Sequence, residues 1–410
     1  MNYMRSIVLV VCCAMLFGSW AKSFQPSAAA IGEENEAPAA AGNWYFAVSG
    51  DSRDCGDVIM PRIAQSIADD RKKTPVEFYW HLGDLRAIYR VDCDMAKRKN
   101  PQTKCAWEGS PGHKDLEKND RYVASAWFDY IANEIRPFEK AGVPFVLGIG
   151  NHEVIPPKSR IEFQQEFKEW LTQKSIQQQR QLDRTKNIPS KDGDTYFHFV
   201  RNKVDFIYLD NSDPGDKDSA VPDPSRGFSL EQLKWLEQVL QADLAEPSVK
   251  TIIVGMHAAL PYSKSRDHAM DNTCSSFCSG VKAYDLLAKV RSQGKNIYVF
   301  ASHSHYFEED IYNSTEHQGN VIPGWIIGTA GAEQYRQQIR YGYLLVRVEP
   351  NGTIVTSFKD VGRNTSSVVP EESPQLLDYC FERNREDEKT TQQKKNIPNN
   401  VKDQHFCKCK

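Results

Sequence analysis

The sequence predicts an α/β fold in which two β-sheets pack together and helices cover their outer faces. Apolar, strand-like runs alternate with helix-like stretches over most of the chain, and the last two strand-like runs are joined as a hairpin. Polar residues follow directly after five of the strand-like runs. Alternation of strands and helices followed by hairpins is typical of packed sheets with helices outside.

Nine runs are expected to be strands, from their apolar residues and from the turn residues that bound them. They span residues 44–48, 76–82, 144–149, 196–210, 251–257, 296–302, 325–330, 341–348 and 354–358. The last two are joined at Pro350-Asn351-Gly352, a sequence that favours a tight turn. We find no internal repeat.

The clearest helix is expected over residues 229–244. Ser229 and Gln232 have the spacing of a capping box at its start. Leucines then recur at helical spacing, at Leu230, Leu233, Leu236, Leu240 and Leu244. This stripe predicts core packing and no site.

The start of the chain has the features of a secretory signal. Arg5 precedes an apolar run from Ile7 to Phe17, which is too short to span a bilayer. Ser19-Trp20-Ala21 then places small residues where signal peptidase cleaves. We expect residues 1–21 to be removed and the protein to be secreted or periplasmic; a retained anchor is the alternative. No later stretch is long and apolar enough to cross a membrane.

The remaining chain divides into three parts by composition. Residues 22–43 are expected to form a flexible lead-in, residues 44–362 the folded domain, and residues 363–410 a Cys-containing, partly disordered tail. The formal net charge is −3, from 51 basic and 54 acidic residues that are scattered along the chain. This pattern gives no nucleic-acid footprint, and the sequence does not indicate an oligomeric state.

Cysteine usage agrees with export. Of ten cysteines, Cys12 and Cys13 lie in the expected signal, which leaves an even number in the mature chain. An even number in an exported protein favours disulfides. Cys93 with Cys105 and Cys274 with Cys278 are plausible local pairs, and Cys55 is expected to be a disulfide partner rather than a metal ligand.

Five short segments carry the chemistry, and each lies at the end of a strand-like run. They are Gly50-Asp51-Ser52-Arg53, Gly83-Asp84, Gly150-Asn151-His152-Glu153, His257 and Ser302-His303-Ser304-His305. Ligands gather beyond the carboxyl ends of strands in sheets covered by helices, so these side chains are expected to converge. Asp84 is the best candidate for a carboxylate that bridges two cations. Mixed Asp, Asn and His ligands suit manganese, iron or zinc better than calcium.

In these motifs the chain resembles the calcineurin-like metallophosphoesterases, whose pattern is D-x-H, G-D, G-N-H-[DE], a lone His and G-H-x-H. The resemblance covers roughly residues 44–335 and includes the segment FSLEQLKWLEQVL at residues 228–240. It implies a four-layer α/β/β/α sandwich of two mixed β-sheets flanked by helices.

The resemblance also implies a two-metal site that hydrolyses a phosphomonoester or phosphodiester. One metal would be held by Asp51, Asp84 and His305. The other would be held by Asp84, Asn151, His257 and His303. His152 would act as an acid towards the leaving oxygen or would bind the phosphate. Two divalent or trivalent ions are therefore expected, or only one because of a departure at residue 53.

That departure is Arg53, which stands where the family has a histidine ligand. Arginine stays protonated and has no lone pair to give to a metal. Three roles are open: Arg53 binds a phosphate oxygen of the substrate, or it points away as a structural ion-pair partner, or its charge repels the first metal. The third role would leave one metal or an inactive protein. The other departure, Ser302 in place of the family's Gly, replaces one small residue by another.

The expected mechanism is attack on phosphorus by a hydroxide formed from a metal-bound water, with metal charge and Arg53 stabilising the negative oxygens. The alternative function is a secreted binding protein that kept the fold and lost turnover through Arg53. Residues 90–118 are interpreted as a lid over the cleft or as a plain surface insertion. His268 could line the cleft or lie at the surface. Asn313, Asn351 and Asn364 begin glycosylation triplets, which matter only in a eukaryotic protein.

Overall fold

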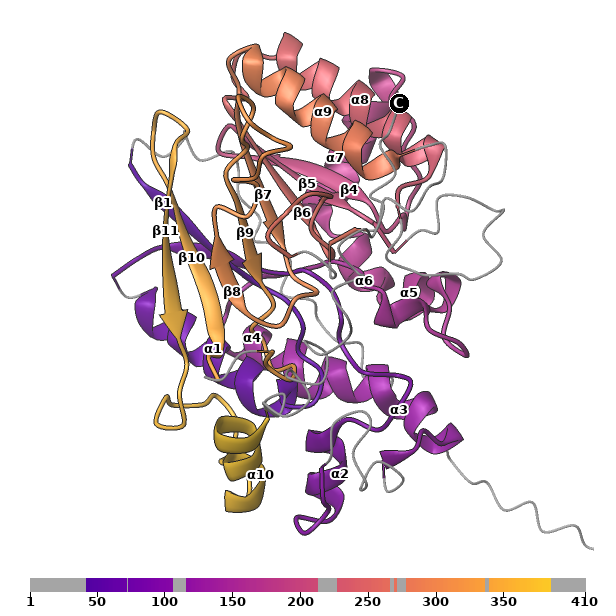
Figure 1. Ribbon diagram of the computed structural model, residues 1–410, viewed down its shortest axis with the longest axis vertical. Coiled ribbons are helices and arrows are strands. Elements are labelled where there is room, and N and C mark those ends of the chain that lie inside the picture. The colour runs from indigo at the N-terminus through magenta and orange to yellow at the C-terminus, as the bar shows by residue number, and fades with distance from the viewer. Residues whose placement is uncertain are drawn as a thin grey trace, which may run out of the picture.

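Two mixed β-sheets form the centre of the molecule, seen here in a computed structural model (Figure 1). The structure describes residues 42–71, 73–105, 116–212, 227–265, 269–270, 278–335 and 339–384. The expected signal (1–21), most of the lead-in, and tail residues 385–410 lie outside them. So do His268, Cys274, Cys407 and Cys409.

The first sheet has the strand order β11-β10-β1-β2-β3. Its strands are β1 (Trp44–Ser49), β2 (Val76–His81), β3 (Phe145–Leu147), β10 (Gly342–Val348) and β11 (Ile354–Asp360). Strands β1, β2 and β3 are parallel, whereas β10 and β11 add an antiparallel hairpin beside β1.

The second sheet has the order β4-β5-β6-β7-β9-β8. Its strands are β4 (Phe197–Arg201), β5 (Val204–Leu209), β6 (Thr251–Met256), β7 (Asn296–Ala301), β8 (Phe307–Glu309) and β9 (Gly324–Ile327). Strands β5, β6, β7 and β9 are parallel, and the edge strands β4 and β8 are antiparallel to their neighbours.

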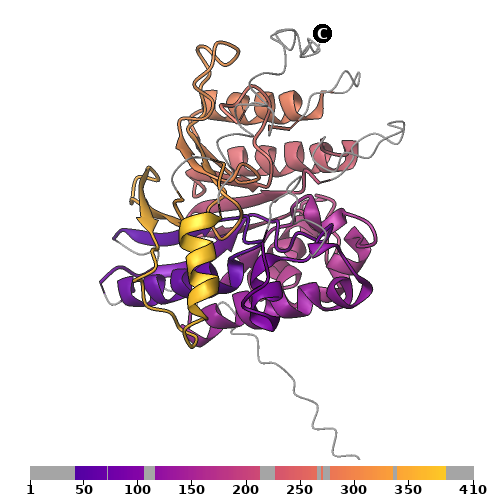
Figure 2. The same ribbon diagram turned by 60° about the horizontal axis from the view of Figure 1, so that its bottom comes forward.

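The helices lie outside the two sheets, so the molecule has four layers (Figure 2). The longer helices are α1 (Gly56–Asp70), α3 (Asp120–Tyr130), α7 (Lys174–Thr185), α8 (Leu230–Ala245) and α9 (Ser279–Ser292). Shorter ones are α2 (Cys93–Lys99), α4 (Arg136–Lys140), α5 (Arg160–Glu166), α6 (Lys168–Leu171) and α10 (Pro374–Asp378). A 3₁₀ turn spans His152–Val154, and π-helical turns span Ile131–Ile135 and Tyr379–Arg383. The predicted fold class, a four-layer sandwich of two mixed sheets flanked by helices, is confirmed.

Aromatic side chains fill the space between the sheets. Phe46 and Phe78, from β1 and β2, both contact Phe206 of β5 edge-on, at 5.1 Å between ring centroids. All three are fully buried. Burial of one such side chain is worth about 1.5–3 kcal/mol, so this layer contributes strongly to holding the sheets together.

The run predicted as one strand over residues 196–210 is instead a hairpin of β4 and β5. The chain turns at Asn202 and Lys203, whose φ angles are 48° and 66°. Two consecutive residues with positive φ form the tight turn that matches the twist of a hairpin. The sequence has no glycine here, so its turn signal is weak.

Helix α8 forms where residues 229–244 predict it, with two differences. The Ser229 side chain accepts a hydrogen bond from the Gln232 amide, but the Gln232 side chain pairs with the backbone of Asp210 instead of closing the capping box. Leu230 is 52% exposed and does not join the core stripe, whereas Leu233, Leu236 and Leu240 are buried.

Disulfides join distant and local parts of the chain. The predicted Cys93–Cys105 pair forms, and Cys55 is bonded to Cys380, 325 residues away. Cys278 is also disulfide-bonded. Asn313, Asn351 and Asn364 are all exposed. Within the described residues no helix is long and apolar enough to cross a membrane.

Candidate metal centre

The five motifs converge at the carboxyl ends of strands from both sheets. Asp51, Asp84 and Asn151 follow β1, β2 and β3 of the first sheet. His257 and His303 follow β6 and β7 of the second sheet. Three of these residues have positive φ without being glycine: Asp51 (62°), Asp84 (60°) and His303 (64°). Such backbone costs about 1–3 kcal/mol per residue and is concentrated at functional sites.

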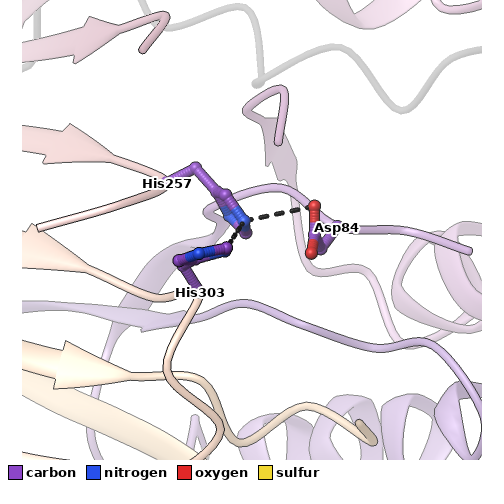
Figure 3. A group of neighbouring side chains, drawn as sticks. All are labelled: Asp84, His257 and His303. Carbon is purple, nitrogen blue, oxygen red and sulfur yellow. Dashed lines mark hydrogen bonds and ion pairs between the residues drawn. The ribbon is translucent and has the colours of Figure 1, made fainter. Parts of the chain in front are cut away.

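One half of the centre consists of four side chains that offer metal ligands, those of Asp84, Asn151, His257 and His303. The His257 Nε2 atom lies 3.1 Å from Asp84 Oδ1 and 3.1 Å from His303 Nδ1 (Figure 3). It also lies 2.9 Å from Asn151 Oδ1. Asp84 and His257 are buried, whereas Asn151 and His303 are partly exposed. The set is therefore anchored inside and open on one side.

The hydrogen bonds of His257 show what this half is built to hold. The Nδ1 atom lies 3.0 Å from the Leu82 carbonyl oxygen, which can only accept, so Nδ1 carries the proton. In a neutral imidazole Nε2 then presents its lone pair to the oxygens of Asp84 and Asn151 and to His303. These four side chains offer a metal ion carboxylate, amide and imidazole ligands; without an ion, a proton on His257 Nε2 supplies positive charge beside Asp84.

Their spacing suits a transition metal. Ligands about 2.1 Å from a common tetrahedral ion lie about 3.4 Å apart. The three neighbouring ligand atoms lie 2.9–3.1 Å from His257 Nε2, and those of Asp84, His257 and His303 are all within 4.8 Å of one another. In the absence of an ion, burial lowers the pKa of His257 but Asp84 more than offsets it, which raises that pKa to about 9. Asp84, His257 and His303 are close enough to hold a metal ion, and Asn151 lies beside His257; that these four residues bind a metal stays a prediction.

The other half of the centre is occupied by the Arg53 guanidinium. Nη1 of Arg53 lies 2.7 Å from His152 Nε2, and Nη2 lies 3.0 Å from His305 Nε2. The side chain is buried. The alternative in which Arg53 points away from the site does not agree with this geometry.

His152 and His305 are oriented as acceptors for Arg53. Their Nδ1 atoms lie 2.6 Å and 2.7 Å from the carbonyl oxygens of Ala87 and Glu333, so in each ring Nδ1 donates and Nε2 accepts. Burial, assisted by the charge of Arg53, lowers the pKa of His152 to about 4 and also lowers that of His305. With Nδ1 donating in each ring, Arg53 meets both Nε2 lone pairs, including that of His305, a predicted ligand of the first metal.

Arg53 itself stays charged. Burial alone would lower its pKa, but Tyr89, Tyr335 and Asp84 outweigh burial and raise the pKa above its ordinary value. Three buried atoms around it have no hydrogen-bond partner among the described residues: Asp51 Oδ1, Asp84 Oδ2 and Arg53 Nε. Asp51 Oδ1 lies 3.3 Å from His305 Nε2, so two of the three predicted ligands of the first metal are adjacent, and the guanidinium bonds to one of these two, His305.

A family model confirms what the fold and the motifs indicate. The model of the calcineurin-like phosphoesterases matches residues 60–307, more than half of the chain. The chain belongs to this family.

Three solved structures resemble this calcineurin-like phosphoesterase at low identity. GAP50, the anchor in the inner membrane complex of Plasmodium, is 13% identical over 87% of this chain and 96% of its own, with a TM-score of 0.42. A novel phosphatase of Mycoplasma pneumoniae is 12% identical over 78% and 93%, with a TM-score of 0.34. The 5'-nucleotidase of Candida albicans SC5314 is 13% identical over 78% of this chain and 52% of its own, with a TM-score of 0.37.

Similarity at this level carries no information on substrate. No curated protein sequence matches the chain significantly.

Glu153 and Ser302 hold the ligand loops of this phosphoesterase in place. The Glu153 carboxylate accepts from the backbone amides of Asp84, Leu85 and Gly150, at 2.7–3.0 Å, and so ties two ligand loops together. Ser302 Oγ lies 3.1 Å from His257 Nδ1 and donates to Leu82 at 3.2 Å. Ser302 thus helps to orient His257.

A buried ion network supports the loop that carries Asp51 and Arg53. The fully buried Arg86 contacts four carboxylates, those of Asp57, Asp94, Asp129 and Glu134. Asp57, Asp94 and Glu134 are close enough to suggest a cation site, but Arg86 already supplies a cation to this group.

The segment 90–118, interpreted from the sequence as a lid or as a plain surface insertion, begins within this support. Arg90 forms a two-fold ion pair with Asp54, and the Asp54 amide donates to Asp92. Residues 90–94 are therefore packed against the loop that carries Arg53. Residues 106–115 of this segment lie outside the described residues.

The C-terminal segment reaches the same loop and was not expected to contribute. Cys380 is bonded to Cys55, two residues after Arg53. The buried Asn384 donates to the Gly331 carbonyl and accepts from the Gln334 amide, which holds the loop whose Glu333 carbonyl orients His305. Tyr335, from the same loop, stacks on His305 at 4.3 Å. No sequence motif marks these residues; only the even cysteine count indicates that the tail is attached.

Proposed function

We propose that this chain is an exported, metal-dependent phosphoesterase with a one-metal centre in which Arg53 takes the place of the first metal. The metal would be held by Asp84, Asn151, His257 and His303, and manganese, iron or zinc would suit this donor set. The observation that carries the proposal is the different state of the two halves. Around His257, the side chains of Asp84, Asn151 and His303 converge on Nε2 with no arginine or lysine hydrogen-bonded to that atom among the described residues, whereas around His305 the guanidinium of Arg53 supplies the donors.

A metal in this position would supply Lewis-acid polarisation of the phosphoryl group and a lower pKa of water. Arg53 provides the second positive charge. Arginine has five N–H donors, and only two of them are needed for His152 and His305. The remaining donors, including the unpartnered Nε, can bind phosphoryl oxygens in the forked geometry that suits them.

The predicted role of His152 as an acid needs a proton on Nε2. In this structure that atom accepts from Arg53, and Nδ1 is committed to Ala87. We therefore propose that His152 positions Arg53. Asp51 is proposed to balance the positive charge of Arg53, which takes the place of the first metal. One Asp51 carboxylate oxygen accepts a hydrogen bond from the His303 backbone amide at 2.6 Å.

Export is proposed from the signal-like start of the sequence, and the two complete disulfides among the described residues support it. The substrate is proposed to be a phosphorylated small molecule or a phosphodiester. The second candidate function is a secreted phosphate-binding protein without turnover, which the saturation of His152 and His305 by Arg53 favours.

Metal analysis combined with hydrolysis assays tests the proposal. The protein is loaded with Mn²⁺, Fe²⁺ or Zn²⁺, and metal content is measured beside turnover of generic phosphomonoester and phosphodiester probes. We expect one equivalent of metal, with turnover that Asp84→Ala abolishes and that the surface variant Asp360→Ala leaves intact. Two equivalents would overturn the role of Arg53, and none would overturn the metal centre. One equivalent without turnover of any probe would establish the binding protein instead.

A further inference from the structure

A cavity of about 600 Å³ lies beside the candidate centre and takes no part in it. It lies between α2 and the C-terminal segment, which are neighbours at the bottom of Figure 1. Its lining includes Lys97, Lys104, Glu333, Tyr379 and Arg383. A volume of this size suits a small ligand.

The cavity contains a poorly compensated positive charge. Lys97 is only 8% exposed, and its Nζ donates to the carbonyl oxygens of Pro101 and Thr103, at 3.3 Å and 2.8 Å. The ring of Tyr379 lies 5.9 Å from Nζ. Among the described residues no carboxylate lies within ion-pair distance of Lys97. Burial and the nearby Arg383 both lower the pKa of Lys97.

The lining holds three cationic residues, Lys97, Lys104 and Arg383, and two acidic ones, Glu333 and Asp378. Asp378 is paired with Arg363 at 2.5 Å, which leaves little of its charge for the cavity. Arg383 and Lys104 add two more cations from opposite walls. A nearly buried ammonium without a counter-charge is costly, and an anion that enters the cavity would remove that cost.

We propose that this cavity is a second anion-binding site, for a small phosphate-class oxyanion. Lys97 has three N–H donors and uses two on backbone carbonyls, so one is left for the ligand. Arg383 adds a forked guanidinium, and Lys104 a second ammonium. The site is separate from the metal centre, but Glu333 belongs to both: it lines the cavity, and its carbonyl orients His305.

Anion binding can be measured without interference from the metal centre in the metal-free double variant Asp84→Ala/Arg53→Gln. Inorganic phosphate is titrated by calorimetry and by thermal shift, at constant ionic strength set with chloride. We expect saturable binding of one phosphate per chain. Adding Arg383→Gln should weaken binding at least about tenfold, the loss expected for one charge-assisted contact. Adding Arg184→Gln, on α7 over the other sheet, should leave it unchanged.

Arg383 is the decisive residue because its side chain is exposed, and the melting temperature of Arg383→Gln checks that the fold is kept. Lys97→Gln is the second variant, with its melting temperature as a check because Lys97 also holds the 101–103 turn. The absence of saturable phosphate binding would overturn the proposal, and so would equal affinities in the Arg383→Gln and Arg184→Gln proteins. These outcomes are independent of turnover, so the proposed function does not depend on them.

Discussion

At the scale of single residues, Arg53 decides how the centre works. A guanidinium is a permanent cation with directional N–H donors. Arg53 therefore donates to the Nε2 atoms of two histidines but offers no ligand atom to a metal. A metal is exchangeable and can be bound by substrate, whereas an arginine is fixed to the chain. With the proposed single metal, the centre would combine one permanent and one exchangeable positive charge.

Restoring the family's histidine should convert the centre to the two-metal form. In Arg53→His the ring can join Asp51, Asp84 and His305 as a ligand, so metal content is expected to rise from one equivalent to two. Arg53→Gln is the matched control, because it removes the charge without offering a strong ligand, and it should stay at one. Elemental analysis after loading with Zn²⁺ or Mn²⁺ measures both. An unchanged content in Arg53→His would show that Arg53 does not exclude the first metal.

Arg86 is expected to be the most sensitive ion-pairing residue for stability. Its removal leaves buried carboxylates, among them Asp57, Asp94 and Glu134, without their shared cation. Breaking a buried ion pair in this way costs about 3–5 kcal/mol. Arg86→Met should therefore lower the free energy of unfolding, measured in urea, by about that amount.

The control for Arg86 is Arg340→Met, which breaks an exposed pair with Asp360. A surface pair of this kind contributes about 1 kcal/mol at most. Equal losses in the two variants would contradict a central role for the Arg86 network.

At the scale of elements, the C-terminal segment acts as a brace for the ligand loops. The disulfide Cys55–Cys380 attaches this segment to the loop that carries Arg53. The hydrogen bonds of Asn384 attach it to the loop at residues 331–334. Helix α1 begins directly after Cys55, so the brace also fixes the start of a helix. Positions near the end of the chain thereby reach a site formed by strand ends.

Removing this disulfide should destabilise the protein without changing its metal ligands. The bond closes a loop of 325 residues, and loss of a native disulfide commonly costs about 2–5 kcal/mol. Cys55→Ser/Cys380→Ser is expected to lower the melting temperature and to expose the C-terminal segment to limited proteolysis, mapped by mass spectrometry. The matched control is Cys93→Ser/Cys105→Ser, which should leave cleavage of residues 374–384 unchanged. Equal cleavage in both variants would argue against the brace.

His198 links α7 to the β4–β5 hairpin and makes stability depend on pH. Its ring contacts Asp183 of α7 and Asp205 of β5 at 3.0 Å and 2.8 Å. Burial alone would lower its pKa, but these carboxylates raise the pKa to about 10, from 6.5. Because folding raises this pKa, the protonated His198 ring stabilises the folded state. The contribution is complete below about pH 6.5 and is lost as the pH rises towards 10.

The free energy of unfolding should therefore fall by roughly a few kcal/mol between about pH 6.5 and about pH 10. Urea denaturation across this range measures the fall, and His198→Gln should flatten it. A fall of the same size in His198→Gln would assign the pH dependence to other groups.

At the scale of the whole molecule, the metal centre connects the two sheets. Asp84 and Asn151 come from the first sheet, and His257 and His303 come from the second. A bound ion would thus add a link between layers that otherwise meet through aromatic packing. Ligands that bind only the folded state stabilise it by mass action.

Metal removal should therefore lower global stability. At a free metal concentration of about 100 times Kd the gain is about 2.7 kcal/mol, so chelation is expected to lower the melting temperature by several degrees. Differential scanning calorimetry with and without EDTA measures the shift. Asp84→Ala is the control and should show no metal-dependent shift; a shift of wild-type size in that variant would place the stabilising ion elsewhere.

Much of this molecule could be predicted from local patterns. Strand β2 and the stripe of α8 were expected close to their observed places, because buried strands and amphipathic helices have strong periodicity. The β4–β5 turn was missed because Asn202 and Lys203 adopt positive φ without a glycine. The Gln232 side chain does not complete the capping box because it makes two hydrogen bonds with the backbone of Asp210, 22 residues earlier in the chain.

The sequence by itself determined the family, the two mixed sheets and the identities of the candidate ligands, since motifs at strand ends combine short-range pattern with fixed chemistry. It left three roles open for Arg53. Only the tertiary structure decided where that guanidinium lies, because the position depends on His152 and His305, which are 99 and 252 residues away along the chain. The bracing of the site by Cys380 and Asn384 was decided in the same way. Contacts between such distant residues form only when the two sheets and the C-terminal segment come together.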